Sequence, residues 1–410
     1  MSDQSWDVVV IGAGAAGLMA AIRAAERGRR TLLLEKNRKA GVKILMSGGT
    51  RCNITHATDN RGIVEAFGPP GRFLHSALAA FSVDDTVAFF DAEGVATKVE
   101  ETGKIFPVSN KATDVLAALL KRLERSGARL ALDEPVLEMR RQDGRLSLTT
   151  PRRVLSAGKV ILTSGGQSYP GSGTTGDGYR WAEQLGHTII TPRPALAPIT
   201  VALSWVEALR GVTLPDVTVR ILDGQRSLSV RRGSLLFAHF GLSGPVVLDV
   251  SRVVSGHPRP ETLILEMDLL PGMSEDELTN FLKTESAASG KKQLGGVLAV
   301  HLPRRVCDML LEQCGTPVDR KAAALSKEDR SRLVQCVKRL AVPITGTLGF
   351  KKAEVTAGGI ALDEVDSRTM QSKLVPELWI AGEVLDLDGP IGGYNFQAAW
   401  STGWLAGSTV

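Results

Sequence analysis

The chain has 410 residues, of which 43% are hydrophobic and 23% are charged. These values are typical of a globular protein with room for two or three domains. No run of about eighteen apolar residues occurs, so we expect no membrane-spanning helix. The N-terminal MSDQSWD lacks the apolar segment of a secretory signal, and we therefore expect a cytoplasmic protein.

The net charge of +5 and the pI of about 9.0 indicate a weakly basic protein. Its arginines are scattered, with doublets at Arg140–Arg141, Arg152–Arg153 and Arg231–Arg232. No aromatic side chains alternate with them, so we expect no nucleic-acid partner.

Four cysteines occur, and no two of them are closely spaced. They are Cys52, Cys307, Cys314 and Cys336. We therefore expect neither a disulfide framework nor a metal site, which fits a reducing compartment.

Residues 6–35 follow the pattern of a dinucleotide-binding unit. Residues 6–11 predict a buried strand, residues 18–28 a helix, and residues 31–35 a second strand that ends in Glu35. Between the first strand and the helix lies a G-x-G-x-x-G sequence. Its three glycines permit a tight turn, close approach to a pyrophosphate and close packing of the helix. Glu35 can accept hydrogen bonds from ribose hydroxyls and would repel the 2′-phosphate of NADP.

The middle of the chain predicts ordinary core elements followed by an insert. Helices are expected after Ser82 and over residues 110–127, and a hairpin over residues 132–150. The prolines of residues 191–200 mark a crossing into a region of short strands, with later helices beginning at Ser274 and Ser326. We expect a first part of one domain over residues 1–190, an insert over 191–340, and the second part over 341–410.

Two further strands end in glycine. Residues 159–166, KVILTSGG, run into Gly165 and Gly166, and residues 377–385 contain Gly382 and Glu383. The second strand is followed by a glycine-rich loop and a helix. Three such strand ends can converge on one long cofactor, and FAD is long enough to need all three. A helix N-terminus near a flavin would stabilise its anionic reduced ring.

Segments that cover nearly the whole chain resemble one family. They are IGAGAAG with LLLEK, GVKILMSGGTRCNIT, GKIFPVSNKATDVL, TSGGQSYPGSGTTGDGY with AEQLGH, LLFAHFGLSGPVVLD, VTAGGI and SKLVPELWIAGEVLDLDGPIGGYNFQAAWSTG. The chain is similar to FAD-binding flavoproteins related to aminoacetone oxidase and to bile-acid reductases of the BaiN type. The segments SGGTRCN, SYPGSGTTGDGY and FGLSGP are the most specific.

This resemblance implies an α/β fold. The expected architecture is a split Rossmann-like FAD-binding domain of the two-dinucleotide-fold type, with an inserted β-rich and helical domain that covers the flavin. By the same resemblance, FAD is bound non-covalently, Glu35 holds the adenosine ribose, Val136 meets the adenine and Glu383 holds the ribityl chain. The chain departs from its relatives at Thr50, where they often carry glycine, and at residues 163–165, where Thr-Ser-Gly replaces Ala-Thr-Gly.

The residues expected to contact FAD come from these glycine-rich segments and their flanks. They are Gly12, Gly14, Ala15, Ala16, Gly17, Glu35, Lys36, Lys43, Ser47, Gly48, Gly49, Arg51, Cys52, Asn53, Val136, Ser164, Gly165, Gly166, Gly382, Glu383, Asp388, Gly393, Asn395 and Phe396.

Cys52 has two interpretations. A thiol that exchanges electrons with a flavin would need a second cysteine to resolve the mixed disulfide, and no other cysteine lies within the first 300 residues. An isolated cysteine more often packs as a small hydrophobic residue. We therefore favour packing for Cys52, and we expect Arg51 to place positive charge near a reduced flavin.

These observations predict an FAD-dependent oxidoreductase that transfers hydride between flavin N5 and a small organic substrate. The reaction is either the reduction of an activated C=C bond or the oxidation of a small amine or alcohol. His239, Tyr169 and Tyr394 are the candidate proton donors. No second G-x-G-x-x-G is present, so NADH or NADPH, if used as reductant, must enter the substrate cleft. The alternative is a flavoprotein that binds RNA or a protein and uses FAD as a structural or sensing group.

Overall fold

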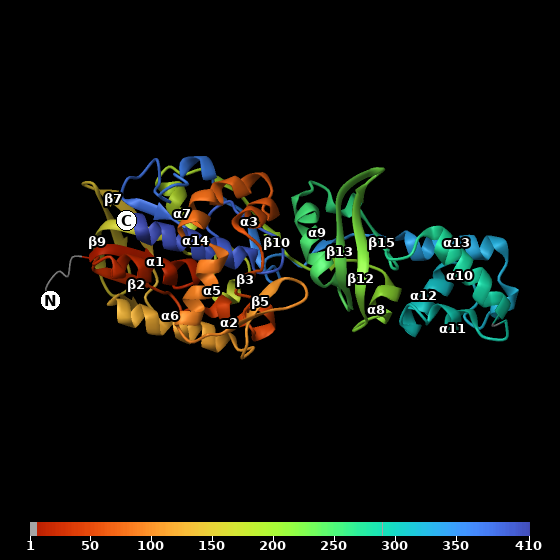
Figure 1. Cartoon of the computed structure of the whole chain (residues 1–410). Coiled ribbons are helices and arrows are strands. Elements are labelled where there is room, and N and C mark those ends of the chain that lie inside the picture. The colour runs from red at the N-terminus through yellow and green to blue at the C-terminus, as the bar shows by residue number, and fades with distance from the viewer. Residues whose placement is uncertain (1–5, 289) are drawn as a thin grey trace. The chain divides into compact units, whose positions relative to one another are not determined.

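Strand β1 (Trp6–Ile11) lies inside a seven-stranded sheet of the computed structural model, which describes residues 6–288 and 290–410 (Figure 1). It pairs in parallel with β2 (Thr31–Leu34) and β9 (Val154–Leu162). Strand β6 (Arg129–Ala131) extends the sheet beyond β2, and β19 (Leu378–Ile380) pairs in parallel with β9. The continuous apolar runs of β1 and β2 suit this position because both faces of a parallel sheet are covered.

An antiparallel hairpin completes this sheet. Strands β7 (Glu138–Gln142) and β8 (Arg145–Thr149) pair with each other, and β8 pairs with the first half of β9. The turn lies at residues 143–144, as the sequence predicted.

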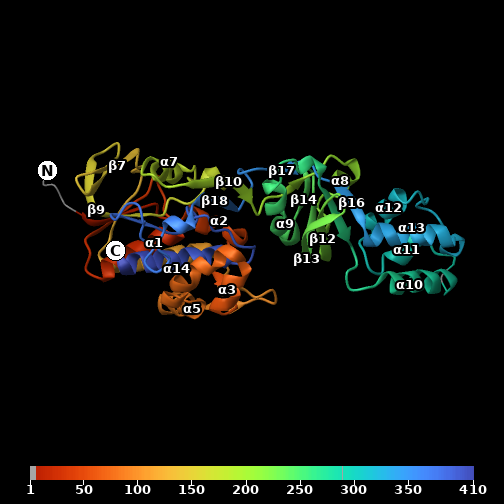
Figure 2. The ribbon, with the colours of Figure 1, turned by 90° about the horizontal axis from the view of Figure 1, so that it is seen from above.

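The two faces of the parallel sheet contribute to separate hydrophobic clusters. Val8 and Val10 belong to one cluster, and Val9 and Ile11 belong to the other. The first cluster includes residues of α1 (Ala15–Glu26), α6 (Ala112–Ser126) and α14 (Tyr394–Thr409). Helices α1 and α14 lie side by side in both ribbon views (Figures 1 and 2). The first and last parts of the chain therefore build one domain.

The remaining elements of this domain are short. They are α2 (Val42–Thr50), β3 (Thr55–His56), α3 (Asn60–Ala66), η1 (Pro69–Leu74), α4 (His75–Ala80), α5 (Val83–Ala92), β4 (Thr97–Val99), β5 (Lys104–Pro107), η2 (Pro170–Ser172), α7 (Asp177–Gln184), β10 (Ile189–Ala195), β18 (Val355–Ile360) and η5 (Leu362–Glu364). Strands β3, β5 and β4 form a small sheet, and β10 pairs with β18.

A second seven-stranded sheet has the order β16-β15-β12-β13-β14-β11-β17. Its strands are β11 (Ile199–Thr200), β12 (Thr213–Asp223), β13 (Arg226–Ala238), β14 (Gly241–Ser243), β15 (Ile264–Asp268), β16 (Leu340–Pro343) and β17 (Gly346–Thr347). Apolar side chains of α9 (Pro245–Gly256) and of this sheet belong to one hydrophobic cluster.

Helices make up the rest of this region. They are α8 (Ser204–Ala208), η3 (Pro260–Thr262), α10 (Glu275–Ala288), α11 (Leu294–Leu298), α12 (Arg304–Gln313), η4 (Ala322–Ala324) and α13 (Lys327–Lys338). Their buried residues join those of the sheet in the same cluster. Ser274 and Ser326 precede α10 and α13 as expected, and each hydroxyl accepts a backbone N–H three residues later.

The chain divides into two compact units. Unit 1 comprises residues 1–194 and 354–410, and unit 2 comprises residues 195–353. The chain therefore returns from the insert to unit 1 after residue 353. The sequence had placed this return after residue 340, so the predicted boundary was too early. The physical reason is that β16 and β17 pair with β15 and β11, so both belong to the sheet of unit 2.

Within residues 6–288 and 290–410, no single helix is both long and apolar enough to cross a membrane. The helical segments Pro69–Ala80 and Val83–Ala92 are bent by 43° relative to each other. They reach the length and apolar composition of a membrane span only when they are counted together.

Candidate functional site

The first glycine-rich turn brings the start of α1 against β1. Gly12 has a φ of 101°, and a Cβ there would lie 2.7 Å from the carbonyl oxygen of Thr163. A Cβ on Gly17 would lie 1.8 Å from the carbonyl oxygen of Gly12, so only glycine allows this helix packing. By contrast, no atom lies within 4 Å of the Cβ position of Gly14, which is the N-cap of α1. The helix N-terminus is therefore open to a ligand beside Gly14, and its N–H groups favour a pyrophosphate.

Glu35 closes this turn from the end of β2. Its side chain is buried, and its two carboxylate oxygens accept the backbone N–H groups of Ala13 and Asn37, each at 2.8 Å. A carboxylate can accept about four hydrogen bonds, so it can still receive ribose hydroxyls. The carbonyl oxygen of Glu35 accepts the N–H of Glu134 at 2.9 Å, which brings the buried Val136 segment to the same strand end.

Lys36 forms hydrogen bonds with other residues of unit 1. Its Nζ donates to Asp177 Oδ2 at 2.7 Å and to Thr175 Oγ1 at 2.6 Å. Burial raises the pKa of Asp177, but the hydrogen bonds from Lys36 and Thr175 outweigh it and lower that pKa. Lys36 therefore fastens the end of β2 to the start of α7.

The end of β9 meets the same turn. Thr163 Oγ1 donates to the carbonyl oxygen of Ile11 at 2.9 Å. The Oγ of Ser164 is buried and has no hydrogen-bond partner among the described residues. Gly165 has a φ of 73°, and a Cβ on Gly166 would lie 2.4 Å from Thr356 Oγ1. This strand end is therefore tightly packed around the buried Oγ of Ser164.

Lys43 and Glu383 are 340 residues apart in the sequence and form an ion pair. Lys43 Nζ donates to Glu383 Oε2 at 2.6 Å, and Glu383 Oε1 accepts Ser168 Oγ at 2.7 Å and Thr356 N at 2.9 Å. Lys43 also donates to Ser168 at 2.6 Å. Glu383 is thus held in one orientation by three donors from three different segments.

The segment 47–53 interrupts α2. Gly48, Gly49, Thr50 and Cys52 all have φ between 55° and 70°, a region that non-glycine residues seldom adopt. A Cβ on Gly48 would lie 2.8 Å from the ring of Phe106, whereas no atom lies within 4 Å of the position on Gly49. The backbone therefore packs on the protein at Gly48 and is open at Gly49.

The side chains that follow these glycines point to different surroundings. Asn53 is buried, and its Oδ1 has no hydrogen-bond partner among the described residues. Arg51 lies 3.9 Å above the centroid of the Phe106 ring and pairs with Glu100 at 2.6 Å. The charge of Arg51 is therefore partly compensated by a neighbouring acid.

Cys52 is fully buried, and burial raises the pKa of its thiol to about 12. A thiol with that pKa stays protonated at neutral pH, and the thiolate is the reactive form. The surroundings of Cys52 suit packing. The Oγ of Ser47, which precedes the glycines, donates to the carbonyl oxygen of Ile44 at 2.9 Å.

The C-terminal loop leads into α14. Gly393 is its N-cap with a φ of 97°, and a Cβ there would lie 2.5 Å from the backbone of Thr55. Asn395 accepts Gly389 N at 2.8 Å and donates to the Gly389 carbonyl oxygen at 2.9 Å, so it stabilises the loop. Phe396 stacks on Trp400 with ring centroids 5.4 Å apart.

Gly382 lies just after β19, and Asp388 lies in the loop between β19 and α14. Asp388 is buried in the C-terminal loop. A Cβ on Gly382, whose φ is 78°, would lie 2.7 Å from the Cβ of Ala16 in α1, and Ala15 begins that helix.

The three candidate proton donors do not share one unit. Tyr169, with a φ of 54°, and Tyr394 belong to unit 1, whereas His239 is an exposed residue of unit 2. Tyr394 stacks on the ring of His56 with centroids 4.5 Å apart, and His56 Nδ1 lies 3.0 Å from the carbonyl oxygen of Gly392.

The sequence did not indicate a role in this site for four further residues. Ser168 and Thr356 orient Glu383, Thr163 joins β9 to the glycine turn, and His56 stacks on Tyr394. Ser168 and Thr356 lie in segments that resemble the family, yet a single serine or threonine gives no signal of its partner. His56 follows the glycine-rich segment directly and could have been considered as its neighbour.

The site fits a flavin dinucleotide. It offers open backbone at Gly14 and Gly49 and a positioned carboxylate at Glu35. It also offers buried polar atoms of Asn53 and Ser164 that have no hydrogen-bond partner in the described part of the chain. A buried polar atom left unpaired costs about 1–3 kcal/mol, so a polar ligand that satisfies it is favoured.

Known proteins resemble the chain over its whole length. The family described as HI0933-like protein Rossmann domain matches residues 6–409. A protein of Escherichia coli strain K12 named ribosomal RNA dihydrouridine synthase is 35% identical over 98% of this chain and 97% of its own. A 3-dehydro-bile acid delta(4,6)-reductase of Clostridium scindens is 30% identical over 97% of each chain.

A solved structure shares the fold. The 3-ketosteroid-delta4-(5alpha)-dehydrogenase from Rhodococcus jostii RHA1 matches with a TM-score of 0.51 and 16% identity, over all of this chain and 97% of its own. The predicted fold class, an α/β Rossmann-type FAD-binding domain, is thereby confirmed.

Proposed function

The chain belongs to the HI0933-like Rossmann family of FAD-binding oxidoreductases, and from this premise we propose that it reduces a C=C bond of uridine in ribosomal RNA. The observation that carries the proposal is the 35% identity, over 98% of the chain, to a protein named ribosomal RNA dihydrouridine synthase.

The reaction class is common to both named relatives. Dihydrouridine is uridine with two hydrogen atoms added across C5=C6, a bond conjugated to a ring carbonyl. A delta(4,6)-reductase of 3-dehydro bile acids likewise acts on double bonds conjugated to a ketone. Both reactions add hydride to the carbon remote from the carbonyl and a proton to the adjacent one. FAD supplies the hydride at N5 when it is bound. This shared chemistry favours C=C reduction over oxidation of an amine or alcohol.

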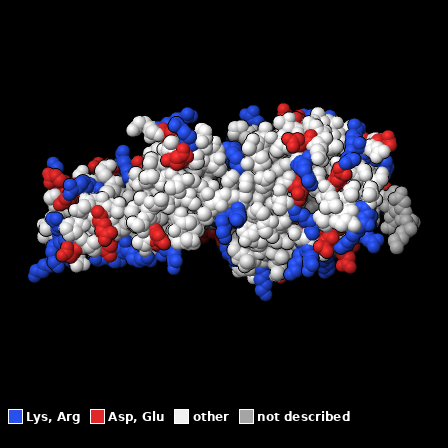
Figure 3. Space-filling model, turned by 180° about the vertical axis from the view of Figure 1, so that it is seen from behind, with Lys and Arg blue, Asp and Glu red and all other residues white. Residues whose placement is uncertain are grey.

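The distribution of charge supports an RNA substrate. Unit 2 carries 21 Lys and Arg against 16 Asp and Glu, whereas unit 1 carries 28 of each. The whole net charge of +5 therefore belongs to unit 2. On the face drawn in Figure 3, Lys and Arg side chains gather along the lower edge of this unit. Phosphates are attracted by such an excess, and this proposal therefore departs from our expectation of no nucleic-acid partner.

A small conjugated ketone is the second candidate substrate. It is favoured by the 30% identity to the bile-acid reductase, which also spans nearly the whole chain.

The test begins with the visible spectrum of the purified protein. NADH and NADPH are added separately without oxygen, and the one that bleaches the flavin is the reductant. Ribosomal RNA from a strain lacking the gene is then added to the reduced protein, and a 3-oxo-4,6-diene bile acid is added to a second sample. Return of the flavin colour with RNA, together with dihydrouridine in the digested RNA, supports the proposal. Return with the bile acid alone selects the second candidate, and no return with either contradicts C=C reduction.

Arginine variants separate binding from chemistry. Arg226→Gln with Arg231→Gln removes two exposed cations of β13, and Arg72→Gln with Arg140→Gln is the matched change in unit 1. Only the first pair is expected to weaken RNA binding. Each lost phosphate contact should reduce the slope of log K against log salt by about 0.7 for single strands and about 0.9 for duplex.

A further inference from the structure

Two short segments of unit 2 pair with each other beside α11. Gln293, the N-cap of α11, forms an antiparallel bridge with Lys321, the N-cap of η4. The N–H of Leu294 donates to the carbonyl oxygen of Arg320 at 2.8 Å and supports this bridge. Leu294 and Ala322 are fully buried in the hydrophobic cluster of unit 2. The two segments are therefore fixed to the core through these two side chains.

The same pairing brings three exposed lysines together. They are Lys291, Lys292 and Lys321, which we call the lysine cluster. The carbonyl oxygen of Lys292 accepts the N–H of Ala322, the residue after Lys321, at 2.9 Å. A Cβ on Gly290 would lie 2.9 Å from the Cβ of Ala323, so the segments approach closely on both sides of the lysines. The sequence could not indicate this cluster because its two parts are about thirty residues apart.

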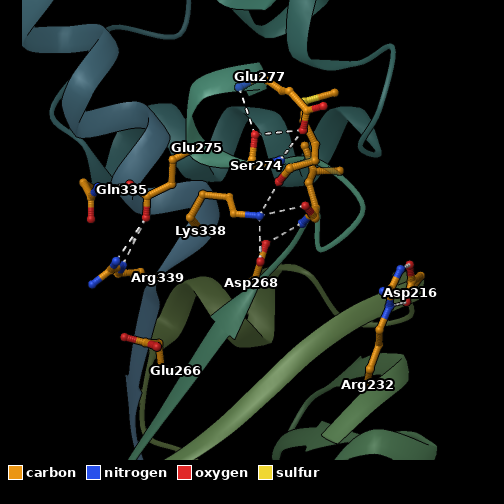
Figure 4. Close-up of polar contacts among 12 residues, drawn as sticks. Asp216, Arg232, Glu266, Asp268, Ser274, Glu275, Glu277, Gln335, Lys338 and Arg339 are labelled. Carbon is orange, nitrogen blue, oxygen red and sulfur yellow. Dashed lines mark hydrogen bonds and ion pairs between the residues drawn. The ribbon is translucent and has the colours of Figure 1, made fainter. Parts of the chain in front are cut away.

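Other cations of unit 2 are bound to carboxylates. Lys338 is buried, and its Nζ lies 2.7 Å from Asp268 Oδ2, while Arg339 pairs with Glu275 at 3.1 Å (Figure 4). These pairs join α13 to the sheet and to α10. By contrast, no residue of 6–288 or 290–410 forms an ion pair with the lysine cluster. Like charges held close together repel each other, so an anion from outside the chain is favoured there.

The surroundings of the lysine cluster add positive charge. Arg304 Nη2 donates to Gln293 Oε1 at 3.2 Å, and its Nε donates to Asp308 at 2.8 Å, which compensates this guanidinium in part. A lysine ammonium binds a phosphate as a point charge on a flexible stem. The cluster itself contains no aromatic ring on which a base could stack. It is therefore suited to the phosphates of a nucleic acid and not to its bases.

We propose that the lysine cluster docks the phosphate backbone of the RNA substrate. The inference rests on the proposed function, because that function supplies RNA as the partner. Unit 2 would hold the RNA by its backbone, while the cofactor residues of unit 1 act on the base. Phosphate contacts position a nucleic acid without reading its sequence, so the cluster adds affinity for RNA of any sequence.

The experiment measures RNA binding by the full-length protein with its oxidised flavin. The variant is Lys291→Gln combined with Lys321→Gln, one lysine from each segment. Fluorescence anisotropy of a labelled RNA duplex, and of one of its strands alone, gives the Kd over a series of salt concentrations. The variant should raise the Kd roughly tenfold or more at about 0.1 M salt. The slope of log K against log salt should fall by about 1.8 for the duplex or about 1.4 for the single strand.

A matched variant in unit 1 controls for net charge. Lys111→Gln with Lys121→Gln removes two exposed lysines at the start and on the surface of α6. It should leave the salt slope unchanged, because neither lysine belongs to the cluster. Thermal unfolding controls for folding, and the cluster variant should melt at the same or a higher temperature because it removes repulsion between like charges.

The outcomes separate this docking surface from the proposed reaction. A cluster variant that binds RNA as tightly as the wild type, or no more weakly than the unit 1 variant, overturns the docking surface. Dihydrouridine formed in ribosomal RNA by the same variant would leave the proposed function standing. Preference of the wild type for vesicles of anionic phospholipid over RNA would also overturn the docking surface, and the reoxidation of the flavin by RNA would then decide the function separately.

Discussion

At the scale of single residues, Cys52 illustrates how burial decides chemistry. It sits in the most specific glycine-rich segment, but it is fully buried and its pKa is raised to about 12. Both facts oppose a thiolate. Among the described residues, the buried Oδ1 of the next residue, Asn53, has no hydrogen-bond partner and can receive one from a ligand.

We therefore expect Cys52→Ser to retain FAD and most of its turnover. Serine is close to cysteine in size, and the backbone N–H of residue 52 can still donate to the carbonyl oxygen of Ser47, as it does at 3.1 Å in the native chain. The ratio of flavin to protein absorbance and the rate of flavin reoxidation are the measurements. Loss of turnover with FAD still bound would show that the thiol acts in the reaction.

His187 is a second residue whose neighbours determine its role. Its Nδ1 lies 3.1 Å from Glu364 Oε2 and its Nε2 lies 2.9 Å from Ser372 Oγ, an order that resembles a hydrolase triad. Ser372 is buried, however, and its Oγ already accepts the N–H groups of Leu374 and Val375. The cluster therefore joins three segments of unit 1 rather than presenting a nucleophile.

This cluster predicts a loss of stability in acid. Burial is the main influence on His187 and lowers its pKa, although Glu364 partly opposes it. The neutral ring is thus favoured in the folded state, so its stabilisation is complete above the unfolded pKa of about 6.5 and declines as the pH falls below it. Urea unfolding gives the free energy of unfolding at pH 7.5 and at pH 5.5. The difference between these two values should be smaller in His187→Gln than in the wild type. The exposed His75→Gln should keep the full pH dependence, and equal behaviour of both variants would contradict this assignment.

At the scale of elements, the contact between α1 and α14 positions the dinucleotide turn. A Cβ on Gly403 would lie 2.3 Å from the carbonyl oxygen of Ala16, and one on Gly407 would lie 2.4 Å from that of Ala20. The helix from the end of the chain therefore lies directly on the backbone of the helix that begins the site.

Gly403→Ala should separate these helices. Alanine favours a helix by up to about 1 kcal/mol over glycine, but overpacking typically costs about 1–3 kcal/mol, so we expect net destabilisation and weaker FAD retention. Gly296→Ala is the control, because its nearest atom is the Arg304 side chain at 3.7 Å. Thermal melts with and without added FAD compare the two, and an equally stable Gly403→Ala would contradict the close packing.

At the scale of the whole molecule, the two units have separate hydrophobic cores. All residues of one cluster belong to residues 199–344, and the other two clusters belong to unit 1. The residues expected to bind FAD all lie in unit 1.

Calorimetry should therefore show two unfolding transitions. FAD in excess should raise the unfolding temperature of unit 1 only. At one hundred times the Kd, FAD should add about 2.7 kcal/mol to the free energy of unfolding of that unit. The isolated fragment 195–353 should keep the other transition unchanged. A single transition that moves entirely with FAD would show that the units unfold together.

The sequence by itself determined the local elements and the family. The β-branched strand, the glycine turn and Glu35 identify the dinucleotide unit because each residue type acts within a few positions of its neighbours. The capping serines at 82, 274 and 326 and the apolar face of α6 located helices for the same reason. The fold class followed from these elements and from the resemblance.

Only the tertiary structure decided which residues meet. The pairing of Lys43 with Glu383, the triple support of Glu383 and the end of the insert at residue 353 depend on contacts between distant segments. A sequence carries no local signal of such contacts, because the energy of a pair depends on the distance, burial and orientation that the completed fold imposes.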